Sequence, residues 1–131
     1  MTNDGDGRER RRCRRFRVRD GVVYLDSLVG EVIDVSFGGL AFRYVSAAGT
    51  RAEASLESGV LFGGEEIFLE NVTLRTVSDF VLACSGEEEE VRRRGMAFGP
   101  LTPEELAVLA RFIRLFARDR EEGEGGPPPV P

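Results

Sequence analysis

Apolar and polar residues alternate with a period of two over much of the chain, which is typical of strands that turn one face to a core. Three stretches carry this pattern most clearly, with apolar positions at Phe16 and Val18, at Ile33, Val35 and Phe37, and at Leu40, Phe42 and Tyr44. Further strands are expected at 22–25, 66–74, 76–84 and 92–98, with loops at 46–50 and 57–59. About six or seven short strands at this spacing predict an all-β fold, a closed or nearly closed antiparallel barrel.

The pattern changes to helical spacing near the end of the chain. Thr102-Pro103-Glu104-Glu105 has the form of a capping box with proline in the first helical position. The residues that follow on one helical face are apolar, namely Leu106, Leu109, Phe112, Ile113 and Phe116. We expect this face to cover the barrel, and a surface that binds a partner is the alternative.

The length of 131 residues fits one domain with flanking tails. We expect the domain at 10–118, a disordered tail at 1–9, and a second disordered tail at 119–131. No apolar run approaches the roughly 18 residues that span a bilayer, and the polar start lacks the apolar stretch of a signal peptide. A cytoplasmic location is therefore expected.

The residue types argue against an enzyme. The chain has no histidine, so it lacks the commonest general base and the commonest transition-metal ligand. It has no nucleophile motif and no phosphate-binding loop. Cys13 and Cys84 are far apart and match no metal-ligand spacing, so we expect neither a metal nor a cofactor.

The net charge of -5 hides a strong asymmetry. Residues 1–20 carry eight arginines and four acids, whereas the remainder carries ten arginines and nineteen acids. A basic segment on an acidic body indicates a local site for an anion. A broad surface for duplex nucleic acid is disfavoured, because the acidic body repels phosphates. The acidic run Glu87 to Glu90 is expected to be a solvated hairpin tip that faces the arginines at 92–94.

The basic segment from Arg10 to Arg15 stands directly before the first strand. A guanidinium donates two parallel hydrogen bonds to a phosphate, keeps its charge near neutral pH and can stack on a nucleobase. Arg11 and Arg15 are four residues apart and could close around one phosphate group. By itself, such a segment is also consistent with a solvated arm or with one that tethers nucleic acid.

The second feature is the run Asp34-Val35-Ser36-Phe37-Gly38-Gly39. Alternation puts Asp34 and Ser36 on the polar face, with Val35 and Phe37 inward. The two glycines permit a tight turn with positive φ and the close approach of a ligand. A carboxylate and a hydroxyl on one edge can bond the N–H groups of a guanine Watson–Crick edge. An ordinary hairpin turn, in which Asp34 and Ser36 bond their own backbone, is the alternative.

Together, the RxxxR pattern of Arg11 and Arg15 and the D/NxSxxG pattern of Asp34, Ser36 and Gly39 resemble the PilZ domain family. The resemblance covers roughly residues 8–118 and includes the stretch RRRGMAFGPLTPEEL. It implies a six-stranded antiparallel barrel with a C-terminal helix that binds the bacterial second messenger cyclic di-GMP. By the same resemblance, the two arginines would hold phosphates and guanine, and Asp34 and Ser36 would bond guanine.

Neighbouring residues extend this site. The resemblance implies that Arg10 and Arg12 assist, and Arg43 is added because it shares the outward parity of Asp34 and Ser36. Arg10 with Arg14 is also an RxxxR pair. Arg15 stands directly before the first strand, as the family pattern expects, which favours Arg11 with Arg15.

Three functions follow as hypotheses. The first is a cyclic di-GMP receptor whose N-terminal arm orders on ligand binding and presents an altered surface to a protein partner. The second is a PilZ adaptor that binds no ligand and acts through protein contacts, although such adaptors usually lack one or both motifs. The third is a small nucleic-acid-binding barrel, although the sequence lacks an aromatic-studded outer strand for base stacking.

Overall fold

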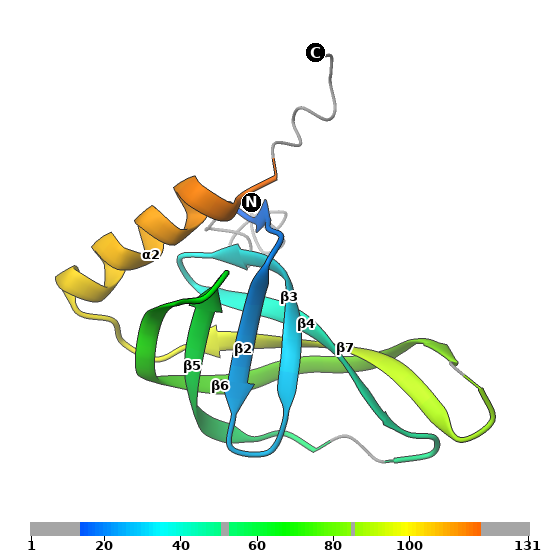
Figure 1. Ribbon diagram of the computed structural model, residues 1–131. Helices are drawn as coiled ribbons and strands as arrows, with labels where there is room; N and C mark the ends of the chain where they lie inside the picture. The colour runs from blue at the N-terminus through cyan, green and yellow to red at the C-terminus, as the bar shows by residue number, and fades with distance from the viewer. Residues whose placement is uncertain (1–13, 51–52, 85, 119–131) are drawn as a thin grey trace, which may run out of the picture.

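The computed structural model of the chain describes residues 14–50, 53–84 and 86–118. Figure 1 shows strands that wrap into a barrel and a helix that lies against one end of it. The elements are β1 (Phe16–Arg17), β2 (Gly21–Leu25), β3 (Val29–Ser36), β4 (Gly39–Ala47), β5 (Leu56–Gly63), β6 (Glu66–Cys84), β7 (Glu89–Phe98) and α2 (Pro103–Phe116). The predicted tails at 1–9 and 119–131 lie outside the described residues.

Six of these strands close into a ring. Neighbours pair in the order β3-β2-β5-β6-β7-β4, every pairing is antiparallel, and the pairing of β3 with β4 joins the two ends. The short β1 pairs with β3 at one side of the ring. The ring of six strands with a C-terminal helix confirms the predicted barrel.

β1 and β2 lie along the same edge of β3, one after the other. Phe16 and Arg17 pair with Val35 and Asp34, and β2 then pairs with the first residues of β3. Between β1 and β2 the chain turns at Asp20, whose φ of 64° lies in the left-handed region. This arrangement brings the residues that precede β1 to the end of β3 that carries Asp34.

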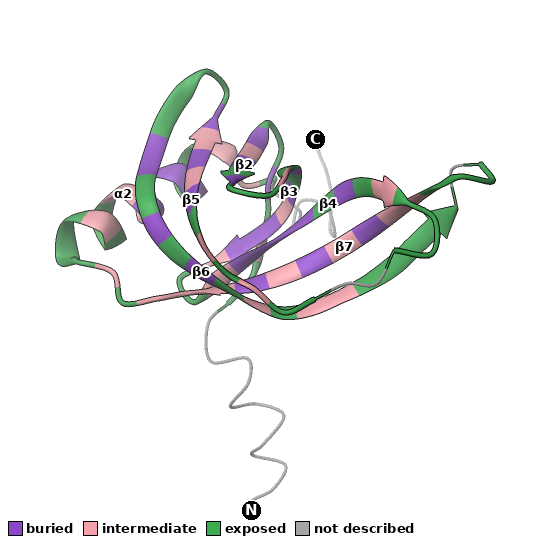
Figure 2. Cartoon of the chain, turned by 90° about the horizontal axis from the view of Figure 1, so that it is seen from below, coloured by how far each residue is buried: buried purple, intermediate pink, exposed green. Residues whose placement is uncertain are grey.

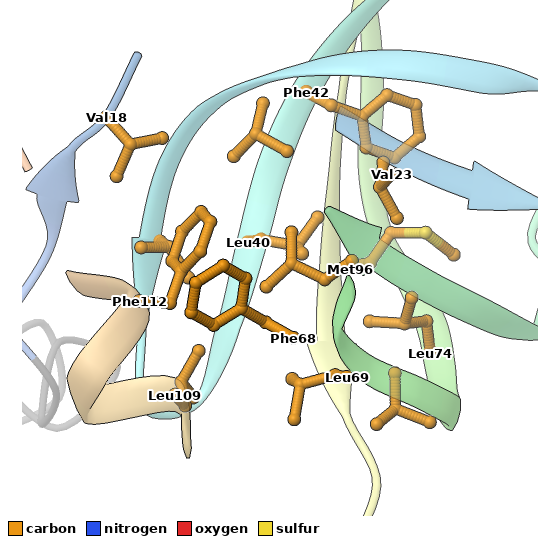
Figure 3. Close-up of a cluster of buried hydrophobic side chains, with 14 of the residues drawn as sticks. Val18, Val23, Leu40, Phe42, Phe68, Leu69, Leu74, Met96, Leu109 and Phe112 are labelled. Carbon is orange, nitrogen blue, oxygen red and sulfur yellow. The ribbon is translucent and has the colours of Figure 1, made fainter. Parts of the chain in front are cut away.

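Large apolar side chains fill the barrel and the space under the helix (Figure 3). Buried and half-buried residues alternate along β7, as the pleat of a strand requires (Figure 2). Burying each large apolar side chain contributes about 1.5–3 kcal/mol, so this core supplies the main stabilisation. The largest fully buried side chains are Phe42, Phe112, Leu61, Leu69, Leu74, Leu109, Val23 and Val35.

The helix confirms the predicted cap and most of the predicted face. The Thr102 hydroxyl accepts from the Glu105 amide at 3.0 Å, and the Thr102 amide donates to the Glu105 carboxylate at 2.9 Å. Leu109, Phe112 and Ile113 are buried against the barrel, whereas Leu106 at the start of the helix is exposed. Within the described residues, no helix is long and apolar enough to cross a membrane.

Two predictions of strand position were wrong. Residues 57–59, expected as a loop, lie inside β5, where Gly59 packs so closely under Leu74 and Leu25 that a side chain has no room. The separate strands expected at 66–74 and 76–84 are one strand, β6. A register shift between Thr76 and Ser78 takes the place of the expected break.

Alternation also fails locally in β3. A register shift between Val32 and Asp34 interrupts the pairing with β4, so Val32 and Val35 are both buried. Phe37 was expected to point inward, but it lies in the turn after β3 and is 41% exposed. Asp34 keeps its predicted place on the face of β3 that points away from the core, opposite Arg17.

Candidate functional site

Three charged side chains from β3, β7 and the residue before β1 meet on the outer face of the barrel. Arg15 Nη1 donates to Asp34 Oδ1 at 3.1 Å, and Arg93 Nη2 donates to Asp34 Oδ2 at 3.1 Å. We call Arg15, Asp34 and Arg93 the outer cluster. The Asp34 side chain is 13% exposed, while those of Arg15 and Arg93 are 55% and 24% exposed. Each carboxylate oxygen therefore has a cationic donor, and both donors remain open to solvent.

Strand register explains how Arg93 reaches Asp34. Asp34 pairs with Ala41 of β4, and Arg93 pairs with Arg43 two residues further along the same strand. The Arg93 side chain therefore crosses β4 diagonally, and Ala41 is fully buried. On its other side, the Arg93 guanidinium lies 5.9 Å from the centre of the Phe80 ring.

Arg93 is the cluster residue that the sequence analysis missed. The sequence predicts only that the run Arg92-Arg93-Arg94 faces the acidic residues 87–90. In the structure Arg92 alone of these three bonds an acid of that run, Glu90, at 2.8 Å. Period-two alternation along β7 could have separated Arg93 from its two neighbours, but nothing in the sequence showed that it would lie beside Asp34.

Arg43 lies on the same outer face, as its parity predicted, but it is not bonded to Asp34. Its Nε donates to Glu31 Oε1 at 3.2 Å, and both side chains are exposed. Arg43 therefore stands beside the outer cluster without joining it.

Ser36 and Gly39 serve the turn between β3 and β4. The Ser36 hydroxyl accepts from the Gly38 amide at 3.1 Å and donates to the Gly39 carbonyl at 3.4 Å, which is the arrangement of an ordinary turn. The expectation of positive φ was wrong, since neither Gly38 nor Gly39 has it. A side chain at Gly39 would instead collide with the backbone carbonyl of Met96 in β7.

Of the predicted arm residues, Arg10, Arg11 and Arg12 lie outside the described residues. Arg14 and Arg15 are described and turn to opposite sides. The Arg14 guanidinium lies over the Phe16 ring at 5.1 Å, whereas Arg15 reaches Asp34. Arg15 rather than Arg14 is thus the described arm residue that meets the second motif.

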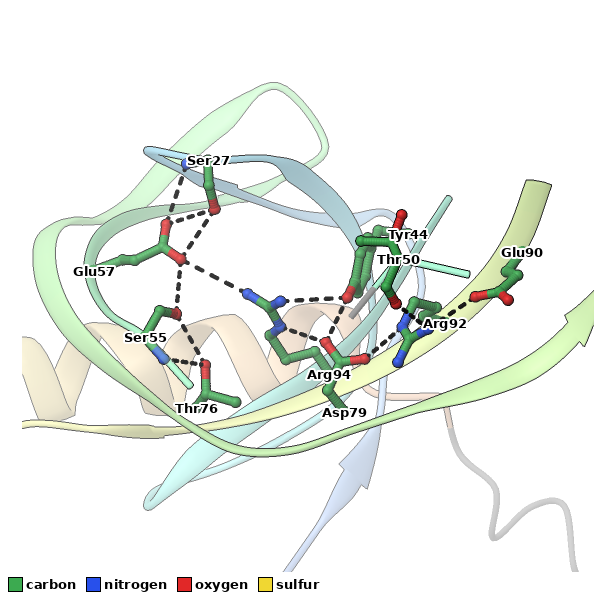
Figure 4. Close-up of polar contacts among 10 residues, drawn as sticks. All are labelled: Ser27, Tyr44, Thr50, Ser55, Glu57, Thr76, Asp79, Glu90, Arg92 and Arg94. Atoms are coloured by element: carbon green, nitrogen blue, oxygen red, sulfur yellow. Dashed lines mark hydrogen bonds and ion pairs between the residues drawn. The ribbon is translucent and has the colours of Figure 1, made fainter. Parts of the chain in front are cut away.

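A second charged group lies on the inner face of the sheet, at residues of β7 that flank Arg93 (Figure 4). Asp79 of β6 accepts from Arg92 Nε and from Arg94 Nε, both at 2.7 Å, and from the Tyr44 hydroxyl. We call Tyr44, Asp79, Arg92 and Arg94 the inner cluster. The side chains of Asp79, Arg92 and Arg94 are 5%, 10% and 8% exposed, so these charges are largely withdrawn from water.

Hydrogen bonding settles the ionisation of the inner cluster. Burial raises the pKa of Asp79, but hydrogen bonds from Tyr44, Arg92 and Arg94 outweigh it and hold the pKa below its usual value. Burial and the bond to Asp79 raise the pKa of Tyr44. Asp79 is therefore ionised and Tyr44 protonated at neutral pH.

Glu57 extends the inner cluster into a cavity of about 370 Å³. Its carboxylate lies 3.7 Å from Arg94 Nη1 and accepts from the hydroxyls of Ser27 and Ser55. Burial raises the pKa of Glu57, but the bonds from Ser55 and Ser27 outweigh it, and the pKa is lowered. Glu57, Arg92 and Arg94 along this cavity thus have charged or hydroxyl partners, which is the arrangement of a structural network.

No protein-family model matches the sequence, and no curated protein matches it. Among solved structures, the chain is similar to K. pneumonia MrkH in its complex with c-di-GMP, with a TM-score of 0.61 and 16% identity, over 87% of this chain and 53% of that chain. It is also similar to the Bacillus subtilis inhibitor of motility MotI/DgrA, with a TM-score of 0.49 and 19% identity, over 81% of this chain and 50% of that chain. The chain spans about half the length of these two proteins. The likeness to MrkH shows that the chain has a PilZ-like fold, as the sequence resemblance predicted.

Proposed function

We propose that this chain is a cytoplasmic receptor for cyclic di-GMP, and that it binds the ligand on the outer cluster. One observation carries this function. The two sequence motifs meet in space, because Arg15 donates to Asp34 at 3.1 Å across 19 residues of sequence. The fold adds support, since MrkH, which has a similar fold, is a protein solved in complex with c-di-GMP.

The outer cluster has the right groups for an exchange of partners. A guanidinium has five N–H donors, so Arg15 can contact a phosphate with donors that Asp34 does not use. The carboxylate of Asp34 can accept the adjacent N–H groups of a guanine edge once Arg93 or Arg15 turns away from it. The ligand would thus give each arginine a phosphate and give Asp34 a guanine, which leaves no charge in the cluster without a partner.

The other predicted residues take supporting roles in this proposal. Ser36 would offer its hydroxyl to guanine from the adjacent turn, and Arg43 would contact a phosphate at the edge of the site. Arg10 and Arg11 would add phosphate contacts as the ligand draws the N-terminal arm onto the barrel. A protein partner would then read the surface that the arm creates.

Titration calorimetry with cyclic di-GMP tests this function. Wild type should bind, and Arg15→Ala should weaken binding by roughly ten- to a hundredfold, because a hydrogen bond to a charged group contributes about 1.5–3 kcal/mol. Arg111→Ala is the matched control, since Arg111 is a similarly exposed arginine paired with Glu66 at 2.9 Å beside the helix. The control should bind like wild type. Wild type that shows no binding at high micromolar ligand would contradict the proposal.

A protein adaptor that needs no ligand is the second candidate. Both oxygens of Asp34 and the hydroxyl of Ser36 already have partners without a ligand. If the chain is such an adaptor, wild type and Arg15→Ala should bind the same protein partner equally well without cyclic di-GMP. A wild-type protein that binds the partner only after cyclic di-GMP is added would exclude it.

A further inference from the structure

The end of the helix runs back along β1. Ala117 forms a bridge with Val18, and the Arg19 amide donates to the Phe116 carbonyl at 3.1 Å. The Arg118 amide then donates to the Arg17 carbonyl at 2.6 Å. Arg118, the last described residue, therefore lies beside Arg17, at the edge of the outer cluster.

The β1 segment beside that point carries exposed positive charge. Arg15, Arg17 and Arg19 alternate with inward residues and turn to solvent. Arg15 shares Asp34 with Arg93, while Arg17 and Arg19 form no salt bridge with any described residue. We call this outward row of three arginines the basic row.

The sequence that continues from Arg118 has the opposite charge. Residues 119–131 carry four acids and one arginine, and the acids are Asp119, Glu121, Glu122 and Glu124. An extended chain advances about 3.3 Å per residue, so four residues beyond Arg118 span about 13 Å. Arg15 lies two residues from Arg17 along the strand, about 7 Å away. By length, the acids at 121 and 122 can therefore reach Arg17 and Arg15.

We propose that the acidic segment 119–124 docks on the basic row and competes with the anionic ligand for Arg15. A tethered segment acts at a local concentration in the millimolar range, which weak ion pairs can exploit. A segment that occupies the site for most of the time raises the apparent Kd of a competing ligand about three- to tenfold. Since this competition acts on the proposed ligand site, it rests on the proposed function.

Two full-length variants with the same change in net charge test the proposal. The tail variant is Glu121→Gln, Glu122→Gln and Glu124→Gln. The control variant is Glu87→Gln, Glu88→Gln and Glu89→Gln, which neutralises three exposed acids near the tip of the β6–β7 hairpin, far from the end of α2 (Figure 1). A general effect of net charge would appear in both variants, whereas docking on the basic row is specific to the tail.

The first measurement needs no ligand. Nuclear magnetic resonance of the arginine Nε–H groups at low salt should show shifts at Arg15 and Arg17 in the tail variant and none in the control. Unchanged signals in the tail variant would overturn the docking. If the Arg15 and Arg17 signals shift in the tail variant but the protein does not bind cyclic di-GMP, the docking is supported and the proposed function is contradicted.

The second measurement is calorimetric titration with cyclic di-GMP. The tail variant should bind about three- to tenfold more tightly than wild type at low salt, while the control variant should bind like wild type. The difference should shrink toward 0.5 M salt, because screening weakens ion pairs. Equal affinity of the tail variant and wild type at low salt would overturn the competition.

Discussion

Asp79 and Asp34 are each held between two arginines, yet their surroundings differ. The Asp79 side chain is 5% exposed and its arginines 10% and 8%, whereas Asp34 is 13% exposed and its partner Arg15 is 55% exposed. On the inner face both the carboxylate and the guanidiniums are withdrawn from water. On the outer face the carboxylate is covered, Arg15 stands in solvent, and Arg93 is 24% exposed. The difference lies in the cations.

Exposure of the cation decides what each cluster can do. A buried guanidinium that loses its carboxylate has no solvent to take over, so the inner cluster must stay intact for the barrel to be stable. An exposed guanidinium exchanges partners at small cost, because water screens it when it turns away. We infer that the outer cluster can release its internal bonds to a ligand and the inner cluster cannot.

The largest expected effect is on stability, from Asp79→Asn. Removing this charge takes the shared anion from two buried guanidiniums and leaves Arg92 with Glu90 and Arg94 with Glu57, which should cost about 3 kcal/mol of unfolding free energy. Urea denaturation at neutral pH measures it. Asp34→Asn is the matched control and should cost about 1 kcal/mol or less, since Arg15 and Arg93 can turn to water. Equal losses in the two variants would contradict the distinction between the clusters.

The second largest effect is expected at Gly39, a motif residue that packs against β7. Gly39→Ala should lower the unfolding free energy by about 1–3 kcal/mol, because the added methyl group meets the Met96 carbonyl of β7. Gly38→Ala is the control, since Gly38 is exposed and has no positive φ. Urea denaturation of both variants checks this. A Gly39→Ala protein as stable as wild type would show that β7 can move aside.

A smaller effect appears in acid. Because the pKa of Asp79 is lowered by folding, its contribution to stability is complete above the ordinary value of 3.8 and is lost as the pH falls toward the lowered one. The stability gap between wild type and Asp79→Asn should therefore be constant from pH 7 to about pH 5 and shrink below pH 4. Denaturation curves at pH 7, 5 and 3 measure the gap. A gap that persists undiminished at pH 3 would contradict this ionisation.

Local pattern predicted much of this molecule. Alternation placed Leu40, Phe42 and Tyr44 in the core, and the capping box placed the start of the helix at Pro103. Both patterns depend only on residues that are close together in the sequence, so they can be recognised without the tertiary fold. Strand number and spacing predicted a closed or nearly closed barrel, and the resemblance to PilZ domains implied six strands in it.

What escaped prediction depends on contacts between distant residues. Gly59 reads as a loop residue, but it lies in a strand because the side chains above it leave no room for another. Arg93 lies 59 residues from Asp34 in sequence, and only the pairing of β4 with β3 and β7 brings the two together. The inner cluster escaped for the same reason, since Asp79 and Tyr44 are 35 residues apart.

The measurement that tests the distinction most directly is thermal unfolding of wild type and Asp34→Asn, each with and without cyclic di-GMP. Saturating ligand at about a hundred times its Kd should stabilise wild type by about 2.7 kcal/mol and raise its Tm. Asp34→Asn should unfold near the wild-type Tm without ligand and gain nothing from it. A wild-type Tm that does not change when the ligand is added would contradict a ligand site at the outer cluster. An Asp34→Asn protein whose Tm rises as much as that of wild type would contradict it as well.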